Sequence, residues 1–237
     1  MIKVTPDTRL LVLTGAGISA ESGLKTFRDS GGLWENHSLE DVCTPEAFAR
    51  DPRLVWRFYQ RRREQAEQAV PNPGHLALAR LETWLGGNFS LITQNVDGLH
   101  SAAGNTRVIE MHGSLAYCLC TCCGARFPMR EVDPGSDLPS CPKCPGVLRP
   151  DIVWFGEFPH RMEEIDQLLH SCDVFLVIGT SGVVYPAAGF VMTARYLGAK
   201  TIAVNLNPTE RNHLIDEFHQ GPAGEILPRL VDQWMAG

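Results

Sequence analysis

The stretch Leu10-Leu-Val-Leu-Thr-Gly-Ala-Gly-Ile-Ser-Ala20 decides the fold class of this 237-residue chain. Its four apolar residues at 10–13 predict a short buried strand, and the glycines that follow predict a tight turn. Gly15-x-Gly17-x-x-Ala20 fits the pattern in which a strand, a turn and a helix N-terminus bind the phosphates of a dinucleotide. The pattern is weak alone, so the rest of the chain has to support it.

Five more apolar runs have the length and composition of strands that are buried on both faces. They lie at residues 89–93, 108–111, 152–155, 174–178 and 201–204. Helical patterns separate many of these runs, at residues 75–85, 162–169 and 187–197. Strands that alternate with helices predict an α/β fold with a parallel sheet.

Two stretches interrupt this alternation. Residues 36–73 carry no clear strand, and Asp51-Pro52 predicts a helix there, as an N-cap followed by proline at the first helical position. Residues 116–149 are rich in cysteine, glycine and proline. We interpret both stretches as insertions that form a smaller lobe. The larger lobe then comprises residues 1–35, 74–115 and 150–237.

The composition narrows the classes of function. The chain is 44% apolar and 20% charged, which suits an ordered globular protein. Its 21 basic and 27 acidic residues give a net charge of −6, so a nucleic-acid partner is not expected. No apolar run approaches the roughly 20 residues that span a bilayer, and the N-terminus lacks a signal-peptide pattern. We therefore expect a cytoplasmic protein with no membrane partner.

Polar or glycine-rich residues follow five of the expected strands, at 15–20, 94–97, 112–113, 179–181 and 205–208. Ligands of open α/β sheets bind beyond the carboxyl ends of the strands, so we expect these residues on one rim. An ordinary dehydrogenase also has an acidic residue about 20 residues after the glycines. Glu35 and Asp41 lie near that distance only in irregular sequence, so residues 179–181 and Asn205 are the better candidates to contact ribose and adenine.

The cysteines form two C-x2-C pairs with the spacing of a zinc ribbon, Cys120 with Cys123 and Cys141 with Cys144. Four thiolates around Zn²⁺ leave no open coordination position, so we predict one structural Zn²⁺. Such an ion would stabilise a segment that has too few apolar residues to fold alone. Two further cysteines, Cys118 and Cys122, lie close enough to leave the register of the ligands open.

Taken together, these motifs resemble the sirtuins, the NAD-dependent protein-lysine deacylases. The matching blocks are Gly15-Ala-Gly-Ile-Ser-Ala-Glu-Ser-Gly23 with Phe27-Arg28-Asp29, Thr93-Gln-Asn-Val-Asp-Gly-Leu-His100, His112-Gly113, the two cysteine pairs, Phe155-Gly-Glu157, Gly179-Thr-Ser181 and Asn205-Leu-Asn207. They span the chain from Gly15 to about Ala223. The resemblance implies an α/β fold whose Rossmann-like parallel sheet carries a smaller lobe of a helical insertion and a four-cysteine zinc module.

The resemblance also implies a role for each matched residue. His112 resembles the catalytic base, and Asn95 is expected to act with it at the reacting centre. Val153, Trp154, Phe155 and Gly156 resemble the segment that pairs with the substrate backbone beside the acyl-lysine tunnel. The residues that resemble the NAD-binding set are Gly15, Ala16, Gly17, Ser19, Ala20, Phe27, Arg28, Gln94, Asn95, Val96, Asp97, Gly179, Thr180, Ser181, Asn205, Leu206, Asn207 and Ala223.

The implied chemistry suits these residue types. Nicotinamide leaves the glycosidic carbon of NAD, and Asn95 and Asp97 can hydrogen-bond its carboxamide. The acyl oxygen then attacks that carbon, and a base takes a proton from a ribose hydroxyl. The imidazole of His112 suits this step near pH 7, because its unperturbed pKa is about 6.5. The implied products are free lysine, nicotinamide and O-acyl-ADP-ribose.

The helix after Asp51 carries Tyr59 and Arg62 three residues apart, so both side chains lie on one face. A phenol and a guanidinium on one face can bind a carboxylate through charge-assisted hydrogen bonds. Spacing alone does not choose Arg62 over Arg63, and an amphipathic surface helix explains the arginines equally well. However, Tyr-x-x-Arg resembles the motif of the sirtuin branch that removes malonyl and succinyl groups. In that branch the pair contacts the distal carboxylate of the acyl group.

We therefore expect an NAD-dependent lysine deacylase that acts on succinyl and malonyl lysines of proteins and less on acetyl lysines. A deacetylase without acidic-acyl preference and a mono-ADP-ribosyltransferase remain open, since both would use the same NAD pocket. A zinc-ribbon module that binds nucleic acid is less favoured, because residues 116–149 show no basic patch. An ordinary NAD oxidoreductase would leave the blocks at 94–97 and 155–157 without a purpose.

Overall fold

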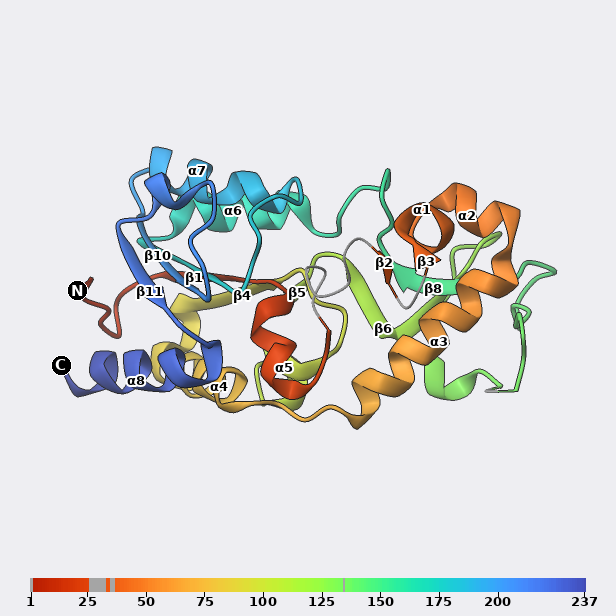
Figure 1. Ribbon diagram of the computed structural model, residues 1–237, viewed down its shortest axis with the longest axis horizontal. Helices are drawn as coiled ribbons and strands as arrows, with labels where there is room; N and C mark the ends of the chain where they lie inside the picture. The colour runs from red at the N-terminus through yellow and green to blue at the C-terminus, as the bar shows by residue number, and fades with distance from the viewer. Residues whose placement is uncertain (1, 26–32, 35–36, 134) are drawn as a thin grey trace.

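A six-stranded parallel sheet lies at the centre of the large lobe (Figure 1). The computed structural model describes residues 2–25, 33–34, 37–133 and 135–237. The strand order is β11-β10-β9-β1-β4-β5, and every neighbouring pair is parallel. The strands are β1 (Leu10–Thr14), β4 (Phe89–Thr93), β5 (Val108–Glu110), β9 (Val174–Ile178), β10 (Lys200–Asn205) and β11 (Glu217–Gln220).

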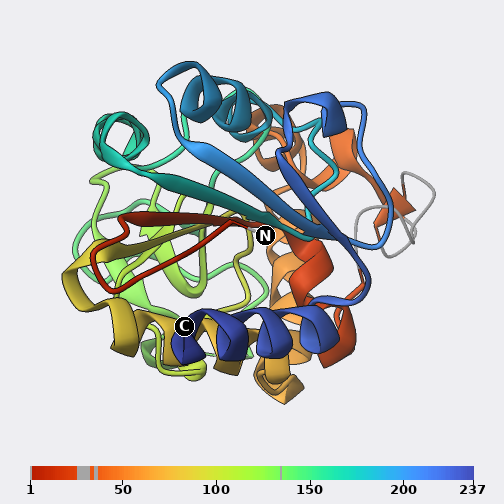
Figure 2. The ribbon, with the colours of Figure 1, turned by 90° about the vertical axis from the view of Figure 1, so that its left-hand side faces the viewer.

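Helices cover both faces of this sheet, as Figure 2 shows. On one face α4 (Pro73–Leu85) and α8 (Ala223–Ala236) pack against Leu10 and Val12 of β1. On the other face α6 (Met162–Ser171) and α7 (Ala187–Tyr196) pack against Leu11 and Leu13. Successive side chains of a strand point to opposite faces, so a central strand between two helical layers must be apolar at every position. The helices expected at 75–85, 162–169 and 187–197 agree with α4, α6 and α7 to within two residues.

Residues 152–155 do not form a strand of the parallel sheet, so that expectation is wrong. The strand here is β8 (Leu148–Ile152), which pairs antiparallel with β6 (Gly113–Cys120). With β7 (Arg126–Pro128) they form a separate three-stranded sheet. The run is apolar because Ile152 and Trp154 are buried against the helices of the small lobe. Packing in the small lobe therefore requires an apolar run here, and such a run has the same pattern as a strand buried in the parallel sheet.

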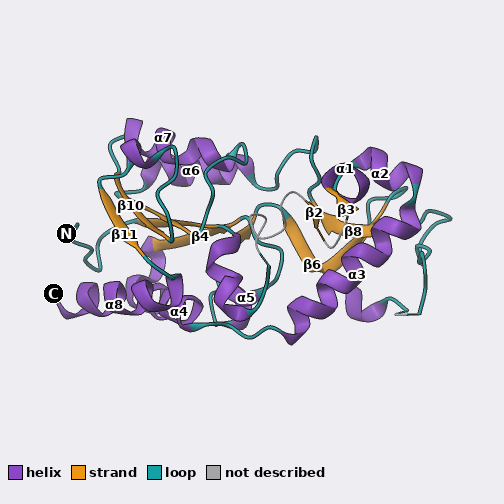
Figure 3. Cartoon of the chain, in the orientation of Figure 1, coloured by secondary structure: helices purple, strands orange, loops and turns teal. Residues whose placement is uncertain are grey.

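The two insertions pack together in the small lobe (Figure 3). The three helices of the first insertion and the sheet β6–β7–β8 share one core, which includes Phe58, Leu115 and Ile152. As expected, α3 begins after Asp51, whose Oδ1 accepts the backbone N–H of Leu54 at 2.9 Å. The remaining helices and strands are α1 (Leu39–Val42), α2 (Pro45–Arg50), α3 (Pro52–Gln68), α5 (Leu99–Ala102), β2 (Leu33–Trp34) and β3 (His37–Ser38).

None of the helices in the described part of the chain has both the length and the apolar character that crossing a membrane requires.

Glu82 of α4 fixes the turn that precedes β5. Its carboxylate accepts the backbone N–H groups of Thr106 and Arg107 at 3.0 Å and the side-chain amide of Asn105 at 2.7 Å. Burial raises the pKa of Glu82, but these hydrogen bonds outweigh burial and hold the pKa below its usual value. A carboxyl group with a lowered pKa stabilises the fold above its unfolded pKa, and this contribution is lost as the pH falls through the folded pKa.

We expect Glu82→Gln to lower the free energy of unfolding by about 2–4 kcal/mol at pH 7, because charge-assisted bonds are lost and donors remain buried. Urea denaturation measures the change. The loss should shrink as the pH falls below the usual pKa of a glutamate, about 4.3, and should disappear once the pH is below the lowered pKa of Glu82, where the native carboxyl group is itself protonated. Glu64→Gln on the exposed side of α3 is the control, with an expected change within about 0.5 kcal/mol. Equal effects of the two substitutions would contradict this role of Glu82.

Candidate active site at the carboxyl ends of the strands

Three glycines hold the turn after β1 against the turn after β9. The N–H of Gly15 donates to the carbonyl of Ile178 at 2.9 Å, and the N–H of Gly17 donates to the carbonyl of Gly179 at 2.8 Å. A Cβ on Gly17 would lie 2.7 Å from the Cα of Gly179, and Gly179 has a φ of +60°. No side chain fits at this contact. The helix that follows is a 3-10 helix, Ala16–Ser22, and the N–H of Gly17 is bonded inside the protein instead of facing a phosphate.

A polar cluster in which Ser19 and Asn95 are buried and Asp97 is partly buried lies directly beyond these turns. Asn95 Nδ2 donates to the carbonyl of Gly15 at 3.2 Å and to Ser19 Oγ at 3.0 Å. Ser19 Oγ donates in turn to Asp97 Oδ2 at 2.8 Å. Since both bonds of Asn95 Nδ2 point into the protein, Oδ1 is the atom that Asn95 can offer to a ligand. Two residues with complementary amide and carboxylate groups are thus fixed side by side, as recognition of a carboxamide requires.

Two buried histidines, His75 and His100, lie behind this cluster, and neither was predicted to have a role. The rings of His75 and His100 lie 4.9 Å apart, His75 Nε2 is 3.5 Å from Ser19 Oγ, and His100 Nε2 is 2.9 Å from Thr14 Oγ1. Burial lowers the pKa of His75 to about 4 and that of His100 to about 3. Both rings are therefore neutral near pH 7. The one indication in the sequence was that His100 ends the block 93–100, which resembles the sirtuins.

His112 follows β5 and faces the end of β4. Its Nδ1 lies 3.1 Å from the carbonyl oxygen of Gln94. A carbonyl only accepts, so Nδ1 carries the hydrogen and Nε2 is left with the lone pair. Burial lowers the pKa of His112 below its usual value, although the bond to Gln94 opposes this effect. A neutral imidazole with a free Nε2 is the form that a general base needs.

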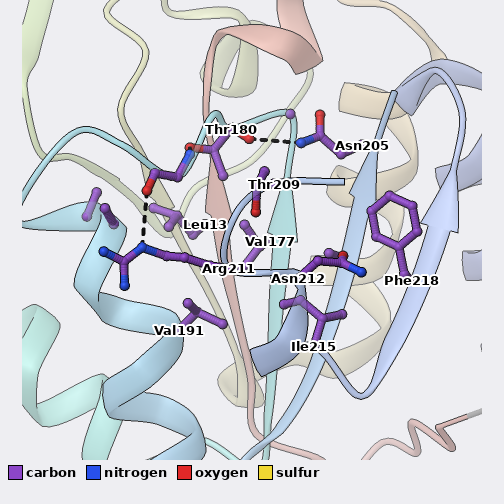
Figure 4. Close-up of a pocket in the computed structure, with 15 residues that line it drawn as sticks. Leu13, Val177, Thr180, Val191, Asn205, Thr209, Arg211, Asn212, Ile215 and Phe218 are labelled. Carbon is purple, nitrogen blue, oxygen red and sulfur yellow. Dashed lines mark hydrogen bonds between the residues drawn. The ribbon is translucent and has the colours of Figure 1, made fainter. Parts of the chain in front are cut away.

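Side chains connect the ends of β4, β9 and β10. Gln94 Nε2 donates to Thr180 Oγ1 at 3.2 Å, and Asn205 Nδ2 donates to the carbonyl of Thr180 at 2.8 Å. Gly179, Thr180 and Asn205 border a pocket with an apolar floor that includes Leu13 and Val177 (Figure 4). The expected convergence of the five strand ends is therefore present in the structure.

The other expected cofactor residues in the described part of the chain lie around the same rim. Leu206 follows β10 and is 56% exposed, while Ala223 begins α8 and is buried. Ala16 and Ala20 lie on the 3-10 helix, Val96 lies between Asn95 and Asp97, and Ser181 and Asn207 follow the strands β9 and β10. Phe27 and Arg28 lie outside the described residues, so their roles stay predictions.

The segment 153–157 bridges the two lobes. The N–H of Val153 donates to the carbonyl of His112 at 2.9 Å, and the N–H of Phe155 donates to the carbonyl of Cys43 at 3.0 Å. The φ of Gly156 is +92°, a backbone conformation that favours glycine. Glu157 closes the segment by accepting the N–H of Trp154 at 2.8 Å. The segment is thereby fixed to the histidine on one side and to the small lobe on the other.

Tyr59 and Arg62 of α3 lie together beside Cys43. The Tyr59 hydroxyl is buried and donates to Cys43 Sγ at 3.4 Å. Burial raises the pKa values of Tyr59 and Cys43, and the positive charge of Arg62, one turn further along α3, opposes both rises. Arg63 lines a small pocket together with Tyr59, and its Nε is 3.8 Å from a carboxylate oxygen of Glu67. The choice of Arg62 over Arg63 as the partner of Tyr59 therefore stays a prediction.

Four cysteine sulfurs gather in the small lobe. The Sγ atoms of Cys120, Cys123, Cys141 and Cys144 all lie within 4.8 Å of one another. The Sγ atoms of Cys120 and Cys144 are 3.4 Å apart, and those of Cys123 and Cys141 are 3.8 Å apart. A tetrahedral zinc ion with Zn–S bonds of about 2.3 Å spaces its sulfurs by about 3.8 Å, so the four residues fit one zinc ion.

Backbone N–H groups of the two turns donate hydrogen bonds to the sulfur atoms of this cluster. The N–H groups of Cys122 and Cys123 donate to Cys120 Sγ at 3.3 and 3.4 Å, and those of Lys143 and Gly146 donate to Cys141 and Cys144. Such bonds stabilise thiolates, the form that binds metal. Cys118 is buried with its Sγ 3.5 Å from the carbonyl of Phe127, and Cys122 is exposed, so neither belongs to the cluster.

Comparisons with known proteins agree with this geometry. The family model described as "Sir2 family" matches residues 15–186. A curated relative from Salmonella typhimurium (strain LT2), named NAD-dependent protein deacylase, is 50% identical over 233 residues, which cover 98% of this chain and 85% of the relative. A relative of the same name from Bdellovibrio bacteriovorus is 53% identical over 230 residues, covering 95% of this chain and 96% of the relative.

Solved structures agree as well. A complex of a Sir2 homologue with NAD has a TM-score of 0.90 and 40% identity, covering 98% of this chain and 91% of that chain. A complex of Sir2 with a p53 peptide and NAD has a TM-score of 0.84 and 32% identity, covering 96% of this chain and 94% of that chain.

We expect Cys141→Ser to reduce bound zinc from one ion per chain to near zero, because a thiolate ligand is lost from the cluster. Elemental analysis of the purified protein measures the metal, and circular dichroism follows the unfolding of the small lobe. Cys122→Ser is the matched control, since Cys122 is a neighbouring thiol outside the cluster. Retained zinc in the first variant, or lost zinc in the control, would contradict this ligand set.

Proposed function

This chain belongs to the Sir2 family and is an NAD-dependent protein deacylase, and we propose that it prefers lysines whose acyl group ends in a carboxylate. Succinyl and malonyl lysines would then be better substrates than acetyl lysines. The observation that carries the proposal is the buried Tyr59 hydroxyl beside Arg62 on one face of α3. A hydroxyl donor and a guanidinium in a largely apolar surrounding are suited to a carboxylate that enters from the active site.

The residues at the strand ends suit NAD as cosubstrate. NAD would supply the glycosidic carbon that bonds to the acyl oxygen as the bond to nicotinamide breaks, and a ribose hydroxyl that finally carries the acyl group. Asn95 Oδ1 and the Asp97 carboxylate would bind the carboxamide of nicotinamide. Gln94, Thr180 and Asn205, which hydrogen bonds link, would line the ribose and adenosine portion. The four-cysteine cluster is remote from these groups and would hold a structural zinc ion.

His112 has the geometry of the base in this reaction. Its Nδ1–H is engaged by Gln94, so Nε2 would accept the proton of a ribose hydroxyl. The segment 153–156 would place the acyl-lysine next to His112, since the N–H of Val153 is bonded to the carbonyl of His112. The same segment contacts Cys43, which touches Tyr59, so the acyl end and the reacting end of a substrate would be held by one piece of backbone.

The strength of the preference follows from one charged hydrogen bond. Acetyl lysine offers no partner to Arg62 and Tyr59, which forfeits roughly 1.5–3 kcal/mol, or about 10- to 100-fold in rate. Some deacetylation would therefore remain. Mono-ADP-ribosyl transfer would use the same NAD-binding residues, but this reaction requires no role for Tyr59 and Arg62. A deacetylase without acidic-acyl preference likewise leaves the pair unexplained.

We expect Tyr59→Phe with Arg62→Met to lower the ratio of kcat/KM for succinyl-lysine over acetyl-lysine peptides by about 10- to 100-fold, because the carboxylate loses its donors. Mass spectrometry of deacylated peptide and O-acyl-ADP-ribose measures both rates. Arg57→Met is the matched control: it removes an exposed arginine of the same helix that lies 3.8 Å from Asp137, and the ratio should stay as in the wild type. A double variant that keeps the succinyl preference would refute the proposal.

The pH dependence of kcat/KM tests His112 as the base. Because burial lowers the pKa of His112 below 6.5, its neutral form persists as the pH falls through the usual titration range of histidine. We expect a level profile from alkaline pH down to about 6.5 and a tenfold loss per pH unit below the pKa of His112. His170→Asn, at an exposed site on α6, should leave the profile unchanged. A profile that already falls above pH 7 would argue against His112 in this role.

A further inference from the structure

The indole of Trp154 is held rigidly although it lies in a connecting segment. It is 3% exposed and packs between Phe48, at a ring distance of 5.4 Å, and the guanidinium of Arg149, which lies 3.4 Å from its ring centre. Arg149 also forms a two-point ion pair with Glu157 at 2.6 and 2.9 Å. Because Glu157 binds the backbone N–H of Trp154 as well, ring and backbone are fixed by the same carboxylate.

This arrangement directs the only polar atom of the indole at the Tyr59 hydroxyl. Trp154 Nε1 donates to Tyr59 Oη at 3.1 Å. An indole N–H only donates, so the hydrogen of the Tyr59 hydroxyl cannot point toward Trp154. It points instead to Cys43 Sγ at 3.4 Å. The positive charge of Arg62 acts on both of these groups.

The partner that Tyr59 now donates to is a weak one. A thiol sulfur accepts hydrogen bonds poorly, whereas a carboxylate accepts them strongly. A hydroxyl that receives a hydrogen bond also becomes a better donor, because chains of hydrogen bonds polarise one another. When a substrate carboxylate lies beside Arg62, it would therefore be favourable for the Tyr59 hydroxyl to donate to this carboxylate instead of to the Cys43 sulfur. The hydrogen bond from Trp154 to Tyr59 would remain in place during this change of acceptor.

We propose that Trp154 is a positioning residue for acyl specificity: its indole N–H keeps the Tyr59 hydroxyl directed at the carboxylate of an acidic acyl group. This inference rests on the proposed function, because it assigns a second residue to the same recognition. Trp154 itself need not touch the carboxylate. The clamp by Arg149 and Glu157 supplies the rigidity, and the indole N–H supplies the direction.

The test is Trp154→Phe, which keeps an aromatic ring between Phe48 and Arg149 and removes the N–H donor. We expect the ratio of kcat/KM for succinyl over acetyl peptides to fall about five- to tenfold, the effect of one neutral hydrogen bond. Trp56→Phe is the matched control, since Trp56 is another buried indole of the small lobe and packs on the side of the cysteine cluster. The control should keep the wild-type ratio.

A double variant separates positioning from mere packing. In a Tyr59→Phe background, Trp154→Phe should change the ratio no further, because the hydroxyl through which Trp154 acts is already absent. An equal loss in both backgrounds, or an unchanged ratio in the single variant, would overturn the inference. If the wild type itself shows no succinyl preference, the proposed function fails and this inference falls with it. A wild-type preference with an unchanged Trp154→Phe ratio refutes this inference alone.

A second measurement does not depend on a folded Trp154→Phe variant. The indole N–H resonance of Trp154 is assigned in ¹⁵N-labelled protein as the one that differs between the wild type and the Tyr59→Phe variant. Peptides are then added to the wild-type protein. We expect this resonance to shift when succinyl peptide binds and to shift less with acetyl peptide, because only the former changes the acceptor of the Tyr59 hydroxyl. Equal shifts with the two peptides would contradict the inference.

Discussion

The close contact of Gly15 and Gly17 with Gly179 is the constraint on which the site depends. Backbone packs directly against backbone at this contact, because a Cβ on any of the three glycines would lie within 3 Å of a backbone atom of another residue. The contact joins the ends of β1 and β9 and brings the 3-10 helix over the sheet. Ser19 on that helix then reaches Asn95 and Asp97, so the polar cluster exists because the glycines allow the approach. A buried polar cluster of this kind is stable only when each member is satisfied.

Backbone hydrogen bonds connect the strand ends of the large lobe to the small lobe. The segment 153–157 joins the carbonyl of His112 to the carbonyl of Cys43, and through Cys43 it approaches Tyr59 on α3. The base and the proposed acyl-carboxylate site therefore belong to one connected structure, although α3 and β5 lie in different lobes. Since α3 packs on the sheet β6–β7–β8 beside the four cysteines, a zinc ion there would keep α3 in place without taking part in the chemistry.

The sequence predicted the parallel strands well, because strands buried on both faces leave continuous apolar runs. It misplaced residues 152–155, because Ile152 and Trp154 are apolar for packing in the small lobe and not for membership of the sheet. It did not anticipate α8 or β11, whose short polar strand Glu217–Gln220 lies at the sheet edge. Spacing found Tyr59 but could not choose between Arg62 and Arg63, nor detect Cys43 and Trp154 as neighbours of Tyr59, because these contacts join residues distant along the chain.

The most direct test of the account is a competition in one tube. Purified protein, NAD and equal amounts of a succinyl-lysine and an acetyl-lysine peptide of the same sequence are mixed, and mass spectrometry follows both peptides and the two O-acyl-ADP-ribose products. We predict NAD-dependent loss of the succinyl group ahead of the acetyl group, by a factor of about ten or more. Faster removal of the acetyl group would contradict the role of Tyr59 and Arg62. The absence of any deacylated peptide would contradict the assignment as a whole.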